Sequence, residues 1–475
     1  MFNGEKINKV LGSVIFTHDG ATMYCDSAYQ YVKSNKIDAF GHVRIIDNGT
    51  TVYGDVLYYN GDTQLAKIRG KEVRLVDANQ TLTTQFLDYN MKTSTGVYFN
   101  GGKVVDSEST LTSQRGTYYN QAKKYTFKEN VKLVRKNYTL YSDTLEYHSS
   151  SKLAYFHGPT HIYSDSQHLF AKKGQYHTVK EISRFKDSAY VETKEFKLTG
   201  DSLFFDNAAD ISKAFQNVKL TSIKDTITVF GDAATRWGKL GFSKVYGNAV
   251  ALKKLEKDTL YLLADTLINQ EDTLGRKSGI TAYNHVKLFH QDFQGKSDSL
   301  IYLLTDSTIS MFRDPVLWNK NNQITGDTVL AILKNGEINR AYVNTNSFVI
   351  SHDTLTRFNQ IKGRNMVAYF KEGDLDYVDV LGNGESIYYA KDDADNSLIG
   401  LNYIICSNMI IYFKKNQLNQ ISFLRKPDAK FIPPQQISPS DRELKNFKWR
   451  EEIKPQLYEF ISRTNFSNRI IVENQ

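Results

Sequence analysis

Hydrophobic and polar residues alternate along most of this chain, in short runs that recur about every 30 residues. One run has the form Gly/Ser-Asp-x-Leu-x-Tyr/Phe and occupies residues 54–59, 142–147 and 200–205. A second run, Ala-x-x-Gly/Asn-x-Val-x-Leu, follows about a dozen residues later, as at 130–133 and 217–220. Because successive side chains of a β-strand point to opposite faces, the pattern predicts strands with one apolar and one polar face.

The spacing of these runs predicts the architecture. Tyr59, Tyr89 and Tyr119 follow one another at intervals of 30 residues, and about twelve copies fit between Asp26 and Asn408. A repeat of this length cannot bury its own apolar face, so it must stack on its neighbours. The sequence therefore predicts an all-β, elongated, solenoid-like stack of about twelve repeats of about 30 residues.

The alternation also predicts which side chains face the interior. In one copy, Asp143, Leu145 and Tyr147 are expected on one face, with Thr144 and Glu146 on the other. The Asp recurs at about a dozen equivalent positions, which is typical of a structural role at the start of a strand rather than of paired catalytic carboxylates. The predicted inward-facing, candidate ligand-lining set is Val43, Leu57, Tyr59, Val73, Leu75, Val131, Leu133, Leu145, Tyr147, Leu203, Phe205, Val218, Leu220, Val286, Leu288, Leu300 and Tyr302.

The pattern changes after Arg425. Five of the seven prolines lie beyond it, and proline lacks the donor that a sheet interior requires. We therefore predict a repeat domain over residues 1–425 and a proline-rich, partly helical tail over 426–475 that packs on the last repeat or leaves it. Residues 440–443 have the form of a capping box, which predicts a short helix with Leu444 and Phe447 facing inward, interrupted by Pro455.

Composition and charge narrow the class of protein. The chain has 475 residues, 13% aromatic and 24% charged, which excludes a disordered chain. Its apolar runs are only strand-length, so no membrane-spanning helix is expected. The net charge of +8 favours an anionic partner, such as a phosphate-bearing lipid or a nucleic acid. Lysine and arginine are spread along the chain rather than clustered with stacking aromatic residues, which argues against nucleic acid.

The termini and the cysteines carry less information. Cys25 and Cys406 lie near opposite ends of the predicted array, beyond the reach of a disulfide within one chain. Residues 10–16 match the second of the two sequence runs, but no copy of the first run precedes them. We therefore expect the true N-terminus, with any signal peptide, to be missing from this sequence.

Motifs for catalysis and for cofactors are not found. There is no P-loop and no Gly-x-Ser-x-Gly, and residues 382–384 lack the third glycine of a dinucleotide fingerprint. Residues 392–396 resemble a calcium loop without its central glycine and final glutamate, and are expected to form a solvated turn. We predict no enzyme, no cofactor and no metal site. Half of the histidines are expected to be ordinary strand and loop residues, although they fall within 30 positions: His148, His157, His161, His168 and His177.

The ordered runs, together with residues 17–29, 382–391 and 406–413, resemble the OstA-like proteins of Bacteroidetes-type bacteria. This family is related to LptA and to the periplasmic domain of LptD, and the resemblance covers roughly residues 10–425. It implies a β-jellyroll of stacked V-shaped antiparallel strands that bridges the periplasm and holds the acyl chains of lipopolysaccharide in an apolar groove. The chain departs from the family in being longer than a minimal bridge protein and in having no outer-membrane barrel after its jellyroll.

The resemblance also implies partners and a location. The expected ligand is lipopolysaccharide or lipooligosaccharide, and the expected partners are jellyroll domains of the inner- and outer-membrane Lpt components, with end-to-end self-association as a further possibility. The expected location is the periplasm, in association with the outer membrane or free of it.

Two alternatives to a lipid carrier remain open from the residues alone. The first is a structural β-solenoid, such as a scaffold or an adhesin, whose lining residues form a closed, dry core. The second is an enzyme or a nucleic-acid binder. Saturable uptake of acyl chains separates the carrier from the scaffold.

Overall fold

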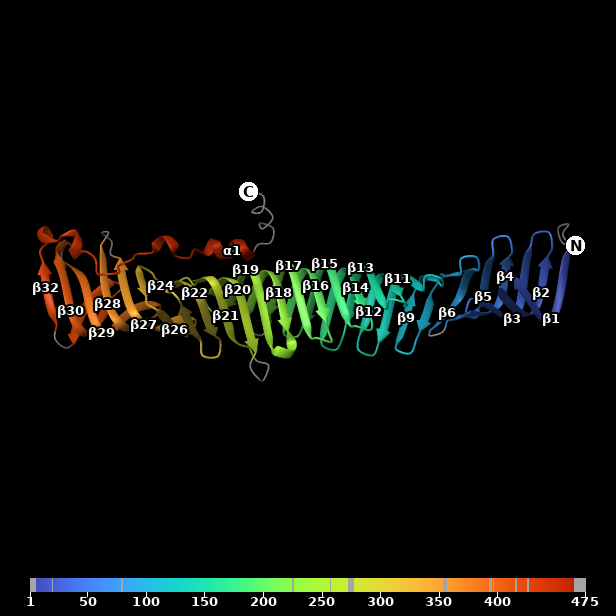
Figure 1. Cartoon of the computed structure of the whole chain (residues 1–475), viewed down its shortest axis with the longest axis horizontal. Coiled ribbons are helices and arrows are strands. Elements are labelled where there is room, and N and C mark those ends of the chain that lie inside the picture. The colour runs from blue at the N-terminus through green and yellow to red at the C-terminus, as the bar shows by residue number, and fades with distance from the viewer. Residues whose placement is uncertain are drawn as a thin grey trace. The chain divides into compact units, whose positions relative to one another are not determined.

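The computed structural model describes residues 6–18, 20–77, 80–223, 226–256, 258–271, 277–352, 357–392, 395, 397–414, 417–424 and 427–464. The chain divides into two compact units, Met1–Ala214 (unit 1) and Phe215–Gln475 (unit 2). Each unit is a stack of antiparallel β-strands (Figure 1), so the predicted all-β fold is confirmed. Among the helices in the described part of the chain, none has the length and hydrophobicity needed to cross a membrane.

Unit 1 is formed almost entirely by strands joined through tight turns. Its strands are β1 (Ile7–His18), β2 (Ala21–Tyr31), β3 (Lys36–Asp47), β4 (Thr50–Asn60), β5 (Leu65–Asp77), β6 (Gln80–Asn90), β7 (Thr95–Tyr98), β8 (Gly102–Val105), β9 (Ser109–Ser113), β10 (Arg115–Tyr119), β11 (Lys124–Arg135), β12 (Thr139–His148), β13 (Leu153–Tyr163), β14 (Gln167–His177), β15 (Ile182–Thr193) and β16 (Phe196–Asp206). Strand β17 (Ile211–Ser222) contains the boundary between the two units.

Unit 2 continues the strand pattern and adds short helical turns. Its strands are β18 (Ile227–Trp237), β19 (Phe242–Lys254), β20 (Thr259–Glu271), β21 (Lys277–Phe289), β22 (Phe293–Leu303), β23 (Thr308–Phe312), β24 (Val316–Asn319), β25 (Asn322–Thr325), β26 (Thr328–Lys334), β27 (Glu337–His352), β28 (Phe358–Lys371), β29 (Asp374–Lys391), β30 (Leu398–Lys414), β31 (Gln417–Leu424) and β32 (Asp428–Ile432). Its helical segments are the 3-10 turns η1 (Gly238–Leu240), η2 (Pro434–Gln436), η3 (Pro439–Asp441) and η4 (Glu451–Ile453), and the helix α1 (Leu457–Thr464).

The long strands are bent, and their two halves belong to two facing walls. In unit 1, β6 pairs with β7 through one half and with β8 through the other. Strand β11 does the same with β10 and β9. We call the halves that align with β7 and β10 wall A, and those that align with β8 and β9 wall B. Each long strand therefore crosses from one wall to the other, which is the V shape that the family resemblance implied.

In several strands, the bend is a two-residue bulge in the left-handed backbone region. In β3 the pairing with β4 shifts between Phe40 and Val43, and Gly41 and His42 have φ values of 75° and 42°. A Cβ at Gly41 would lie 2.2 Å from Asp26 Oδ2, so a larger residue would be both strained and crowded. Asn130 and Asn217 occupy the equivalent corners, with φ values of 55° and 51°. The Gly/Asn of the second sequence run is therefore the corner residue.

The recurring Asp faces this corner from the neighbouring strand. Asp26 Oδ2 lies 2.7 Å from His42 Nδ1, and Asp265 Oδ2 lies 2.8 Å from His285 Nδ1. A structural role for the Asp thus fits, but its position is the middle of a strand and not the start.

One expectation about the Asp is wrong. Asp143 is exposed while Leu145 is buried, so the two do not share a face. The pairing of β12 with β13 shifts between Ser142 and Thr144, which reverses the alternation at that point.

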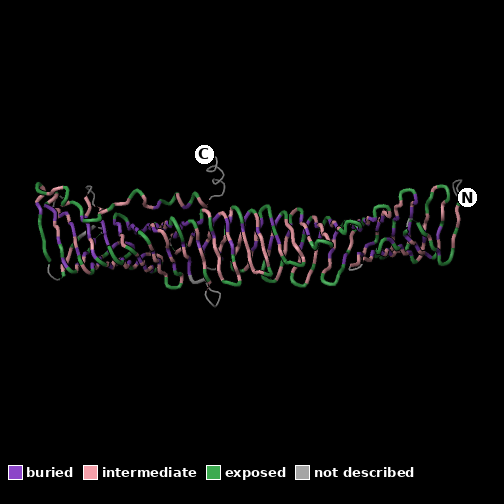
Figure 2. The backbone as a smooth tube through the Cα atoms, viewed as in Figure 1, coloured by how far each residue is buried: buried purple, intermediate pink, exposed green. Residues whose placement is uncertain are grey.

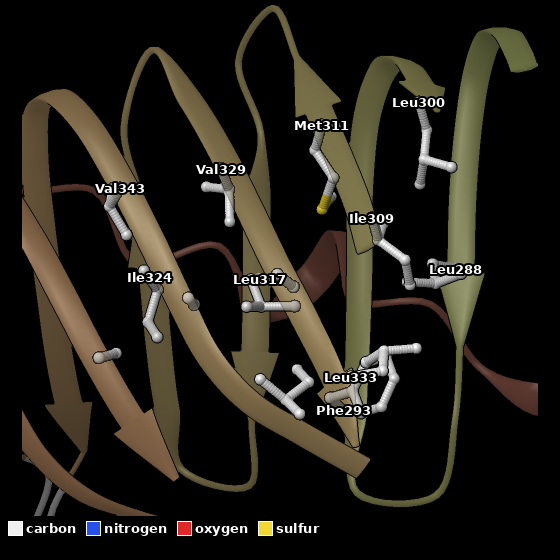
Figure 3. Packing of buried hydrophobic residues seen from close by; sticks show 14 of the residues in the cluster. Leu288, Phe293, Leu300, Ile309, Met311, Leu317, Ile324, Val329, Leu333 and Val343 are labelled. Carbon is white, nitrogen blue, oxygen red and sulfur yellow. The ribbon is translucent and has the colours of Figure 1, made fainter. Parts of the chain in front are cut away.

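The core lies between the two walls. Buried and exposed residues alternate along the strands of both units (Figure 2). In unit 2 four short strands each belong to a single wall. Strand β23 pairs with β26 on one wall, and β24 pairs with β25 on the other. Met311 and Val329 belong to the first pair and Leu317 and Ile324 to the second, and their buried side chains meet in one cluster between the strands (Figure 3).

The C-terminal tail runs back along the outside of unit 2, towards β19 and β20 (Figure 1). Two buried glutamines hold its backbone in the manner of a strand partner. Gln360 Nε2 donates to the Arg442 carbonyl oxygen at 2.6 Å, and Gln360 Oε1 accepts from the Leu444 amide at 2.8 Å. Gln323 makes the same pair of bonds with Lys448 and Arg450.

Apolar side chains anchor the tail at both ends of this path. Leu444 packs against Phe348 and Ile350, and Phe460 of α1 is fully buried beside Val250 and Leu263. These partners stand on the outer face, because the neighbouring Val349 and Ala251 belong to the interior cluster.

The tail differs from the expectation in two respects. The capping box is formed by Ser438 and Asp441 around the single turn η3, and the helix lies beyond Pro455 instead of before it. Leu444 does face the sheet, and Phe447 packs partly buried against the same cluster. The division of the chain at residue 425 stays a prediction, since β32 still pairs with β30. Within the expected solvated turn, residues 393, 394 and 396 lie outside the described residues.

Candidate functional site

The residues predicted to face inward mostly do so. Thirteen of the seventeen are buried, and the remaining four are half-buried: Leu133, Tyr147, Phe205 and Leu220. Their outward neighbours differ as the alternation requires: Tyr58 is 46% exposed beside Leu57 at 0%. Lys132 is exposed, whereas Thr144 and Glu146 are half-buried. A ligand-lining role for these residues stays a prediction.

Aromatic rings fill part of the interior of unit 1. Tyr118 and Tyr125 stack with ring centroids 4.6 Å apart, and Phe127 continues the stack at 6.2 Å from Tyr125. A gap beside them, lined also by Leu75 and Leu82, has a volume of about 10 Å³, roughly the space that one water molecule needs. A long acyl chain would therefore need the walls to move apart here.

The free edges of the two walls meet along a line that we call the mouth. On wall B the mouth is bordered by the turns after β1, β3 and β5, and on wall A by the turns after β4, β6 and β10. Tyrosine hydroxyls cross it. The Tyr89 hydroxyl donates to Asp47 Oδ2 at 2.7 Å, and the Tyr118 hydroxyl donates to Asp77 Oδ2 at 2.7 Å.

A third crossing extends the row, and the Tyr125 hydroxyl also donates to Asp77 Oδ2, at 3.2 Å. The Tyr59 hydroxyl lies 3.3 Å from His18 Nδ1. We call these six residues the mouth seam: His18, Asp47, Asp77, Tyr59, Tyr89 and Tyr118. Their partners stand 41 or 42 positions apart in the sequence, so the seam repeats with the stack.

Smaller polar groups support the seam. Ser94 Oγ donates to Asp47 Oδ2 at 3.4 Å, and Asn48 Nδ2 donates to Ser94 Oγ at 3.3 Å. Asn120 Nδ2 donates to Thr50 Oγ1 at 3.2 Å, again between a wall A turn and a wall B turn. Asp47 is only 5% exposed, and a buried carboxylate needs such donors.

Burial keeps Tyr89 and Tyr118 protonated. It is the largest cause that raises the pKa of Tyr89 above its usual value, followed by the hydrogen bond to Asp47. Burial likewise raises the pKa of Tyr118, ahead of its bond to Asp77. Both hydroxyls are therefore hydrogen-bond donors at neutral pH.

The interior of unit 2 is closed by other means. Tyr302, one of the predicted lining residues, receives a hydrogen bond from Lys253 Nζ at 2.9 Å, and the same ammonium lies 5.0 Å from the tyrosine ring centroid. Leu288 and Leu300, also predicted, are buried in the core cluster (Figure 3).

The histidine cluster brings only two of its members together. His161 Nδ1 and His168 Nε2 lie 3.1 Å apart with their rings stacked on the outer face. His148 instead bonds Glu146 at 2.6 Å, and His157 is exposed. In the part of the chain that the structure describes, no group of three or more His, Cys, Asp or Glu side chains is placed to hold a metal ion.

Sequence reasoning found Tyr59 but missed the rest of the seam. The Tyr-Asn steps at 30-residue spacing were a signal for Tyr89. The sequence does not indicate Asp47, because a single sequence does not reveal that its carboxylate is buried against a tyrosine 42 positions away.

Comparisons with known proteins bear on what this arrangement is. No curated protein matches the sequence. A solved structure with similarity is that of LptH from Pseudomonas aeruginosa, described as the LptA-homologous periplasmic component of the conserved lipopolysaccharide transport device. It is 14% identical, the match covers 24% of this chain and 83% of LptH, and the TM-score is 0.22.

The family described as OstA-like protein matches residues 3–143 and again residues 135–201. The matched region lies within unit 1 and contains every residue of the mouth seam. Over residues 3–201, the chain is therefore similar to the OstA-like protein family.

Proposed function

We propose that this protein is a periplasmic carrier of lipopolysaccharide that shields the acyl chains in the interior of unit 1. Similarity to the OstA-like family suggests a role in lipopolysaccharide transport. The observation that carries the finer proposal is an apolar interior, within the OstA-like residues, whose walls meet at the mouth through side chains. Such walls can part without the loss of any strand pairing.

The energetics suit a carrier. Each methylene group removed from water contributes ~0.8 kcal/mol, so several acyl chains held between the walls would not dissociate into water. They would instead pass between similar sites, which a stack of similar repeats supplies. The protein would act without a cofactor and without catalysis, and jellyroll domains of other transport components, or further copies of this chain, would receive the lipid.

Photo-crosslinking at paired positions tests the proposal. A photoreactive phenylalanine at Leu57 faces the interior, and one at the adjacent Tyr58 faces outward. Leu145 and Tyr141, both on β12, form a second pair, with Tyr141 43% exposed. We expect lipopolysaccharide adducts at Leu57 and Leu145 and few at Tyr58 and Tyr141. Equal labelling of both faces would contradict the proposal.

A structural scaffold without a lipid ligand is the second candidate. The large cluster of buried apolar residues in unit 2 favours it. If purified chain shows no saturable uptake of lipopolysaccharide and no interior adducts, the scaffold explains the molecule better.

A further inference from the structure

We propose that the mouth seam of unit 1 is a lateral gate, through which the ligand passes sideways into the interior. This inference rests on the proposed function and adds the route and the residues that control it. The ligand class is an amphiphile whose apolar chain goes between the walls while its polar head stays at the mouth.

The two edges of the walls are joined in different ways. At the corner, wall A and wall B are joined by the continuous backbone of each strand, as in β3 and β11. At the mouth, the bonds of the seam run between side chains, from Tyr89 to Asp47 and from Tyr118 to Asp77. Breaking these bonds separates the walls while the strand pairing within each wall stays intact.

The polar chemistry of the seam suits an edge that opens. A purely structural core would be closed best by apolar groups, since buried carboxylates are costly unless their bonds are kept. Hydroxyl and carboxylate groups, by contrast, can exchange their partner for water or for the polar head of a ligand when the mouth opens. Tyr89 also presents its ring to the interior, so the residue that latches the mouth is continuous with the lining.

The crossings of the seam repeat along unit 1. Asp47 and Asp77 occupy successive turns of wall B, and Tyr59, Tyr89 and Tyr118 occupy successive positions of wall A. Opening at one crossing leaves the next in place, which lets the gate open locally around one ligand instead of along all of unit 1.

The experiment locks and loosens the gate in the full-length chain. For the lock, Asn48 and Ser94 are replaced by cysteine, because their side chains already touch across the mouth at 3.3 Å, and the pair is closed by oxidation or by a short thiol crosslinker. For the loosened gate, Tyr89→Phe and Tyr118→Phe remove the two hydroxyls. Tyr58→Phe, which removes an outer-face hydroxyl, is the matched control.

The readout is the rate at which a photoreactive phenylalanine at Leu57 captures purified rough-type lipopolysaccharide. We expect the locked chain to capture at least tenfold more slowly and to recover on reduction. The double Phe variant should capture several-fold faster, with faster amide hydrogen exchange at the turns 47–50 and 90–95. The Tyr58→Phe control should match the parent in both measurements.

The outcomes separate the gate from the proposed function. If the locked chain captures lipid at the parent rate, the gate is wrong and the lipid travels along the interior, while the carrier proposal stands. If neither the locked nor the open chain yields interior adducts, the carrier proposal fails and the gate fails with it.

Discussion

At the scale of single residues, the two sequence runs describe a corner and its acceptor. The Gly or Asn supplies left-handed backbone at the bend. A side chain at the bend also donates a hydrogen bond to the Asp of the neighbouring strand, as Asn248 Nδ2 does to Asp232 Oδ2 at 2.9 Å. The repeat is conspicuous in the sequence because a bend makes narrower demands on residue type than a strand face does.

Replacing a corner glycine tests this explanation. At Gly41 the backbone φ is 75°, and the Cβ of an alanine would also clash with Asp26. At Gly12 the backbone φ is 76°, but nothing lies within 4 Å of the Cβ position. Backbone strain alone costs about 1–2 kcal/mol. We expect chemical denaturation to show a clearly larger loss for Gly41→Ala than for Gly12→Ala. Equal losses would mean that the contact with Asp26 does not matter.

Tyrosine ionisation predicts the response to alkaline pH. Burial raises the pKa of Tyr98 from 10.0 to about 12. The unfolded chain therefore ionises this residue first, so its contribution to stability is complete below pH 10 and is lost as the pH rises from 10 to about 12. Two pKa units correspond to about 2.7 kcal/mol. Urea unfolding at pH 9 and at pH 11.5 should show a smaller loss for Tyr98→Phe than for the parent, and identical losses would contradict the assignment.

Alternation along a strand was sufficient to place most inward-facing residues. Leu57, Val131 and Val286 are predicted from their neighbours alone, because strand geometry is local. It was not sufficient for Asp143, since a bulge reverses the alternation and a single sequence does not mark where the bulge falls.

At the scale of elements, the tail behaves as an added strand on the outside of unit 2. Its hydrogen bonds come from the glutamine side chains of β25 and β28 instead of from a neighbouring backbone. Nothing in the tail sequence indicates these partners, which lie more than 80 positions away. Its prolines predicted that the sheet ends, but not where the chain goes afterwards.

Removing one glutamine should release this part of the tail. Gln360→Ala deletes both bonds to the backbone of Arg442 and Leu444 and leaves those groups unpaired, at about 1–3 kcal/mol each. We expect faster hydrogen exchange and proteolysis within residues 442–450, with the strands of unit 2 unaffected. Gln435→Ala, at an exposed position of the same tail, is the control and should leave the exchange unchanged.

The helix α1 depends on one anchor. Phe460 is fully buried, while Tyr458 of the same helix is 71% exposed. Phe460→Ala should cost about 3–5 kcal/mol of local stability and undock the helix, seen as a loss of protection from exchange over Leu457–Thr464. Tyr458→Ala should leave the helix docked. A docked helix in Phe460→Ala would mean that the hydrogen bond from Lys287 Nζ to the Glu459 carboxylate suffices.

At the scale of the whole molecule, the repeat and the family resemblance together predicted an all-β stack of bent strands. The seam and the tail were not predictable in the same way, because both depend on contacts between residues far apart in sequence. The two units also differ in how their interiors are closed. Unit 1 has hydroxyl–carboxylate bonds at its mouth, whereas in unit 2 the Lys253 ammonium donates to the Tyr302 hydroxyl.

If the protein is a carrier of lipopolysaccharide, its interior must recognise the acyl chains and not the sugar or phosphate groups of the ligand. The most direct measurement is therefore the equilibrium binding of full-length chain to intact lipopolysaccharide and to the same molecule with its acyl chains removed. We predict saturable binding of the intact form and a loss of at least a hundredfold in affinity for the deacylated form. Equal affinity for both forms would place the ligand on the charged outer surface and contradict the account.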